Sequence, residues 1–238
     1  MRLSILAILS AFVMTSCNFD LVVNAESGNG NVVTKNRNLS DDFTGVKGSS
    51  GLDVFLEEGT ENKVVVEADS NLHEFIETEV VNGVLKIRTT KNINRASAKK
   101  VYVTYTSLNV LEASSGADVI ANDIVRADQL ELSSSSGADL EVEIDAREVT
   151  AKTSSGADIK VSGRAKYLTA DASSGSDLNA RNLEANKVRA EVSSGADIVI
   201  NVTESLDAKA SSGGDIKYYG DPMTVNKKDG KSSAIRKM

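Results

Sequence analysis

The chain has 238 residues, a formal net charge of −7 and a pI near 4.9, with no tryptophan and one proline. This acidic balance, without a basic stripe, argues against a nucleic-acid partner held through phosphate contacts. The length fits one sizeable domain, and a single cysteine cannot form a disulfide within the chain.

The first 16 residues have the features of a secretory signal peptide. Met1 and Arg2 precede an apolar run that is too short to span a bilayer permanently. The run ends in Met14-Thr15-Ser16-Cys17, which is similar to a bacterial lipobox, with Met14 where leucine is more usual. We expect Cys17 to be the lipid attachment site and the mature N-terminus, so that acyl chains hold the protein to a membrane. Residues 17–38 are predicted as the lipidated N-terminus and a polar tether.

Residues 39–107 show strand patterns with little sign of helix. Strands are expected within Phe43–Leu56, Lys63–Ala68 and Lys100–Thr106, and Asn82-Gly83 predicts a hairpin turn between two further strands. Ser70–Glu77 is the only segment of this region with a helical pattern, where Ser70 or Asn71 could cap one or two turns. The region is predicted either as three degenerate rungs in continuous register, which we favour, or as an antiparallel cap.

Residues 108–225 are built on the phrase Ser-Ser-Gly-Ala-Asp, which returns about every 20 residues. Its glycines are separated by 21, 19, 19, 20 and 18 residues, at Gly116, Gly137, Gly156, Gly175, Gly195 and Gly213. An earlier copy, Ser49 to Asp53, stands alone upstream. A period of this length is typical of stacked repeats.

Apolar residues recur at fixed offsets from each phrase, which predicts the same position in successive rungs. Apolar residues lie one and three positions after each Asp, and Leu or Ala lies three positions before each first Ser. A spacing of two indicates strands whose side chains alternate between core and solvent. We therefore predict a parallel β-helix, with an all-β fold and rungs of roughly 20 residues.

The phrase itself is interpreted as corner chemistry. Glycine suits a positive φ or a close approach, serine hydroxyls can satisfy backbone groups, and aspartate can accept from nearby amides. A second interpretation is an outward carboxylate ladder that binds cations, formed by Asp118, Asp139, Asp158, Asp177, Asp197 and Asp215. Single carboxylates stacked one per rung rarely complete a calcium site, so no metal site is predicted.

No catalytic set is recognisable. His73 is the only histidine, and without a second histidine or a further cysteine it is expected to be structural. A carboxylate pair in a groove remains an alternative, which predicts a groove lined by tyrosines drawn from Tyr102, Tyr105, Tyr167, Tyr218 and Tyr219. Neither catalytic residues nor cofactors are predicted.

The lipobox, the segments Phe43–Val54, Val64–Asp69, Asn82–Ile87 and Val101–Val103, and the repeated phrase together resemble a bacterial family of auto-transporter adhesins named for a head GIN domain. The resemblance covers residues 40–220. It implies a single-stranded right-handed parallel β-helix without a recognised catalytic set, and a role in cell adhesion.

The functional expectation is a non-enzymatic, lipid-anchored adhesin or interaction module in the envelope of a Gram-negative-type bacterium, on the outer membrane. Its expected partners are the membrane and an unidentified surface macromolecule, with homo-oligomerisation open. The alternatives are a carbohydrate-active enzyme on the same scaffold and a self-assembling structural protein of the envelope. Residues 226–238 form a basic tail, expected to be a solvated end or a final cap.

Overall fold

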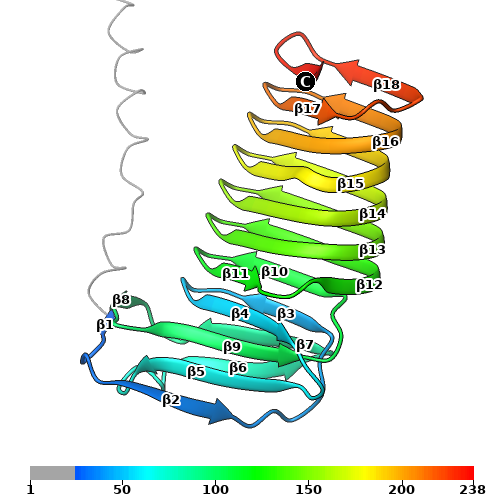
Figure 1. The fold of residues 1–238 in the computed structure, drawn as a ribbon. Coiled ribbons are helices and arrows are strands. Elements are labelled where there is room, and N and C mark those ends of the chain that lie inside the picture. The colour runs from blue at the N-terminus through cyan, green and yellow to red at the C-terminus, as the bar shows by residue number, and fades with distance from the viewer. Residues whose placement is uncertain (1–24) are drawn as a thin grey trace, which may run out of the picture.

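The computed structural model describes residues 25–238. The signal peptide and Cys17 lie outside the described residues, so both stay predictions. Every helix or strand assigned between residues 25 and 238 is a β-strand, and the strands stack along one axis (Figure 1). Among the described residues, no helix has the length and apolar character needed to cross a membrane.

The repeats form a parallel β-helix in which each phrase lies directly against the next, as the sequence predicts. Asp53, Asp118, Asp139, Asp158, Asp177, Asp197 and Asp215 are consecutive partners in the strand register. A rung starts at its Asp, bends, and ends at the first Ser of the following phrase. The strands are β10 (Val110–Ser114), β11 (Asp118–Ala121), β12 (Val125–Ser135), β13 (Asp139–Ser154), β14 (Asp158–Ser173), β15 (Asp177–Val192), β16 (Asp197–Ala210) and β17 (Asp215–Tyr219).

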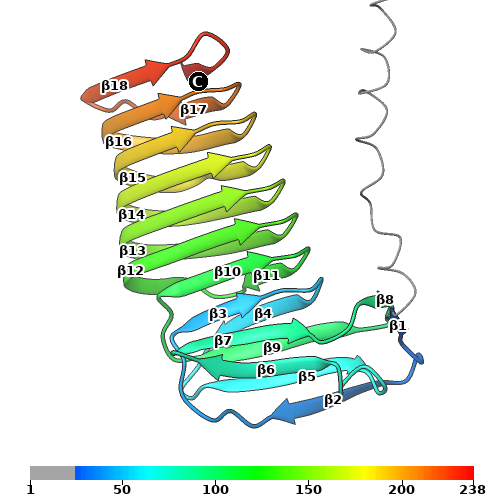
Figure 2. The same ribbon diagram turned by 180° about the vertical axis from the view of Figure 1, so that it is seen from behind.

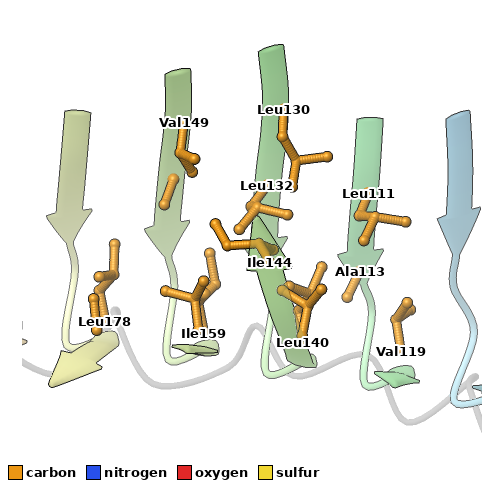
Figure 3. Packing of buried hydrophobic residues seen from close by; sticks show 14 of the residues in the cluster. Leu111, Ala113, Val119, Leu130, Leu132, Leu140, Ile144, Val149, Ile159 and Leu178 are labelled. Atoms are coloured by element: carbon orange, nitrogen blue, oxygen red, sulfur yellow. The ribbon is translucent and has the colours of Figure 1, made fainter. Parts of the chain in front are cut away.

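Aliphatic ladders fill the interior. Along β13, buried and exposed residues alternate, so that Leu140, Val142 and Ile144 point inward between charged neighbours. The same register positions of adjacent rungs carry Val119, Ile159 and Leu178, which pack along the axis (Figure 3). Full burial of such a side chain contributes about 1.5–3 kcal/mol, so the repetition itself builds the core.

The N-terminal end is a cap rather than three consecutive rungs. β3 (Gly45–Gly48) and β4 (Asp53–Glu58) pair directly with β10 and β11, although some 50 residues separate them in sequence. The intervening chain lies on the other side of β3 and β4, where β7 (Val84–Thr89) and β9 (Lys99–Tyr105) pair with them in parallel (Figure 2). β6 (Ile76–Val81) and β5 (Lys63–Asp69) then close the end in antiparallel pairings.

Two local predictions in the cap have different outcomes. The hairpin is confirmed, because Asn82 and Gly83 join β6 to β7 with φ of 54° and 75°. The helical hint at Ser70–Glu77 is wrong: Leu72 accepts from Phe75 and Ile76 in a tight turn, and β6 begins at Ile76. From Ile76 onward the backbone is paired with β7, so it is not available for the hydrogen bonds of a second helical turn.

The predicted polar tether is wrong from Glu26 onward. β1 (Glu26–Ser27) pairs with β8 (Ile93–Arg95), and β2 (Val32–Arg37) pairs with β5. The buried carboxylate of Asp69 accepts hydrogen bonds from the backbone N–H groups of Gly30, Ser97 and Ala98, the first at 2.5 Å. A carboxylate 39 residues away in sequence thus fixes a segment whose Asn and Gly content is typical of a linker.

The basic tail is a final cap, one of the two alternatives. β18 (Thr224–Asp229) pairs with β16, and β19 (Ala234–Lys237) pairs with β17. Lys227 lies beside the buried Ala208 in the strand register, and its Nζ lies over the ring of Tyr218, 4.6 Å from the ring centroid. A charged side chain therefore covers the end of the apolar ladder.

Candidate functional site

The repeated corner is held by its backbone. In each copy the second serine and the glycine both have positive φ, for example 58° at Ser155 and 67° at Gly156. Two successive residues of this kind define a type I′ turn. The N–H of Gly137 donates to the carbonyl of Ser155 at 3.1 Å, and the N–H of Asp158 donates to the carbonyl of Ala138 at 3.0 Å. These bonds repeat from rung to rung, so neighbouring corners satisfy one another.

The side chains of the phrase do little of the corner work that the sequence suggested. Between residues 25 and 238, the first-serine hydroxyls of Ser135, Ser154, Ser173 and Ser193 make no hydrogen bond to protein. Apart from Asp215, which accepts from the N–H of Ala234 at 2.9 Å, the stacked aspartates accept no side-chain hydrogen bond within that range. A Cβ at Gly156 would meet nothing within 4 Å, so the positive φ of this position, and not crowding, is what favours glycine there.

The stacked aspartates form a ladder of like charge on one side of the corner. Burial, followed by repulsion from Asp118 and Asp158, raises the pKa of Asp139. Burial, followed by repulsion from Asp158 and Asp197, raises the pKa of Asp177. Lys100 lies beside Asp53 at one end of the ladder. No group of three or more potential ligands in the described residues is arranged to hold a metal ion.

The other side of the corner carries an open groove. Its central hollow, about 580 Å³, is lined by Lys152, Asp171, Glu191 and Lys209 together with first serines of the phrases. One adjoining hollow shares Lys152 with it and reaches Asn109, and another shares Glu191 with it and reaches Lys228. The groove therefore runs along the axis over several rungs.

Asp171 is the unusual side chain of this groove. It lies between Lys152 and Glu191 in the register of β13, β14 and β15 and makes no hydrogen bond among the described residues. Burial and then repulsion from Glu191 raise its pKa, against the attraction of Lys152 and Arg189. Glu191, by contrast, is held by Arg189 at 2.7 Å and Lys209 at 3.6 Å, and the hydrogen bond from Arg189 is the main cause that lowers its pKa.

The tyrosines do not gather in one place. Tyr105 and Tyr218 are buried in the core, and burial raises the pKa of Tyr105 to about 12. Tyr102 stacks on Phe55 with ring centroids 5.5 Å apart, Tyr167 lies beside Glu148 and Lys187, and Tyr219 packs against Arg181. The groove expected for an enzyme, with tyrosines along it, is not formed by these residues.

His73 lies in the N-terminal cap, far along the chain from the groove. It is 5% exposed, and its Nε2 is 3.0 Å from the carbonyl of Val33 on β2. Arg37 donates to the carbonyl of His73 at 2.9 Å. These contacts tie β2 to the turn before β6, which is a structural role.

The described residues thus define a repeat protein of the parallel β-helix class, with a polar groove along one face. The chain belongs to the family described as "Putative auto-transporter adhesin, head GIN domain", whose model matches residues 42–222. No curated protein matches the chain.

Solved structures share the fold at low sequence identity. A putative adhesin from Bacteroides fragilis superposes with a TM-score of 0.83 at 20% identity, covering 90% of this chain and 100% of the other. A putative lipid binding protein from Parabacteroides distasonis gives 0.72 at 20% identity, with 90% and 100% covered. A putative adhesin from Parabacteroides merdae gives 0.72 at 21%, with 90% and 99% covered. Such likeness shows the fold.

Proposed function

We propose that the protein is a lipid-anchored, non-enzymatic adhesin of the cell envelope, tethered through Cys17 and binding a surface macromolecule with one lateral face. The observation that carries the proposal is the groove, which presents polar and charged side chains over several rungs, among them those of Asp171 and of first serines, which have no hydrogen-bond partner in residues 25–238. Extended repeat surfaces suit recognition of long partners. Membership of an adhesin family supports a place at the cell surface or envelope.

Protease treatment of intact cells tests this function. The described domain is expected to be removed from intact cells that carry the wild-type chain, and a Cys17→Ala variant is expected to lose its membrane association. A domain that becomes accessible only after the outer membrane is permeabilised would contradict the adhesin role.

The carbohydrate-active alternative has one feature in its favour. Asp171 and Glu191 are neighbouring carboxylates in the groove, and the pKa of Asp171 is raised, as in the acid of a glycosidase pair. Glu191 is engaged by two cations, however, and the tyrosines lie elsewhere. Incubation with polysaccharides is expected to yield no shortened products. Cleavage abolished by Asp171→Asn would favour the enzyme instead.

A further inference from the structure

We propose that the groove centred on Asp171 binds a linear, uncharged, hydroxyl-rich polysaccharide lying along the axis of the β-helix. This inference rests on the proposed adhesin function and names the class of its partner.

The groove offers hydrogen-bonding groups that the protein leaves unused. Asp171 has no hydrogen-bond partner in the described residues, and the hydroxyls of Ser154 and Ser173 beside it are equally free. A carboxylate accepts two hydrogen bonds at once, and each serine hydroxyl both donates and accepts. Adjacent hydroxyl groups of a sugar ring supply the matching donors and acceptors.

The charges of the groove favour an uncharged ligand. Lys152 is 3.7 Å from Glu131, and Glu191 is shared by Arg189 and Lys209, so the two signs largely cancel along the face. A polyanion or a polycation would meet like charges as often as opposite ones. This balance differs from that of the aspartate ladder across the corner, where one sign repeats.

The groove lacks the anchors of a protein interface. Strongly exposed large apolar side chains in residues 25–238 are Val32, Met223, Val225 and Met238, all on the terminal layers and none in the central hollow of the groove. Protein interfaces place aromatic or apolar anchors at their centre. The central hollow of the groove is instead lined mainly by serine, threonine and charged side chains, which bind through hydrogen bonds.

The rung spacing favours a polymer over a single sugar. First serines recur in each rung, and adjacent strands are about 4.8 Å apart, so equivalent groups repeat along the groove. A chain of sugars can then contact several rungs, and weak contacts add along its length.

Electrophoresis of the full purified chain in native gels containing polysaccharide tests the inference. The probes are dextran, mannan and xylan as uncharged polymers, with polygalacturonate and chitosan as charged ones. At least one uncharged polymer is expected to retard the protein. Asp171→Ala is expected to weaken the apparent Kd about tenfold or more, because a hydrogen bond to a charged group is lost.

Asp158→Ala is the matched control, since it removes a carboxylate from the same strand on the other side of the corner. Its apparent Kd should equal that of the wild type. The thermal midpoint of both variants reports whether the fold is intact, and Lys152→Gln provides a second groove variant.

Equal losses of affinity in Asp171→Ala and Asp158→Ala would overturn the inference. Retardation by charged polymers alone, or no retardation by any uncharged polymer, would also overturn it. Retardation in gels by a chain that proteases cannot reach on intact cells would contradict the adhesin role alone.

Discussion

Serine at a left-handed position is the residue-level signature of this fold. Ser50, Ser115, Ser136, Ser155, Ser174, Ser194 and Ser212 all have positive φ. Residues with a Cβ lose about 1–2 kcal/mol in this conformation, and asparagine tolerates it better than most. The chain itself uses asparagine at the equivalent place in its hairpin, at Asn82.

Ser155→Asn is therefore expected to stabilise the protein. The free energy of unfolding, measured with urea, should rise by roughly 0.5 kcal/mol because Asn is less strained at positive φ. Ser154→Asn is the control, since the first serine is not among the residues with positive φ. An equal gain from both substitutions would contradict the explanation.

His73 is expected to make the cap sensitive to acid. Burial is the main cause that lowers its pKa, and Lys35 and Arg37 lower it further. The folded state therefore favours the neutral ring, and its contribution to stability is present above the unfolded pKa near 6.5 and lost as pH falls.

Unfolding at a series of pH values measures this effect. Between about pH 7.5 and 5.5 the wild type should lose on the order of 1 kcal/mol more than His73→Gln, which carries no titrating ring. Identical pH profiles for the two proteins would show that His73 is not the titrating group.

At the scale of the element, the aspartate ladder costs stability at neutral pH. The raised pKa of Asp139 means that the folded state favours the protonated carboxyl, so this contribution is present below the unfolded pKa and lost as pH rises. Because the ladder is exposed to solvent, screening keeps the effect small.

Asp139→Asn should raise the free energy of unfolding at pH 7 by a few tenths of a kcal/mol. The gain should disappear below about pH 4, where the wild-type carboxyl is protonated, and shrink in high salt. Destabilisation by Asp139→Asn at pH 7 would indicate that the carboxylate has a stabilising partner.

The regular rungs could be predicted from sequence because each position repeats. Leu140, Ile159 and Leu178 occupy one register position and recur at one offset from the phrase. The arrangement of the cap could not be predicted in this way. β3 and β4 pair with β10 and β11, which are far away in sequence, while the intervening residues lie on the opposite side of β3 and β4. Periodicity carries no information about such an insertion.

The groove was missed for a related reason. Asp171 lies two residues before the first serine of its phrase, a position that also holds Lys152, Glu191 and Lys209. This position is polar in all four rungs, but its residue type and charge change from rung to rung, so it does not stand out as a repeat in the sequence. A comparison of the outward-facing positions of successive rungs, made to find polar residues of changing charge, would have found the groove.

For the whole molecule, both terminal layers place charge where the interior has aliphatic side chains. Lys227 and Asp229 lie beside Ala208 and Ala210 at one end, and Lys35 lies beside Val66 at the other. Charged edges of this kind prevent sheets from joining end to end. We expect side-by-side contacts, and not axial stacking, in any homo-oligomer.

Replacing both charges at the C-terminal end tests this. Light scattering should show a wild type that does not form longer assemblies with concentration, whereas Lys227→Val combined with Asp229→Val should associate. Lys160→Val is the lateral control, since Lys160 faces outward in the middle of the array. Axial filaments of the wild-type protein would contradict the capping role and favour a self-assembling envelope component.

Adhesion of whole cells to a surface coated with the polysaccharide that retards the protein tests the central claim most directly. Cells that carry wild-type protein or Asp158→Ala are expected to adhere, and cells that display the same amount of Asp171→Ala are expected to adhere at least several-fold less. Equal adhesion by all three would contradict an adhesin that acts through this groove.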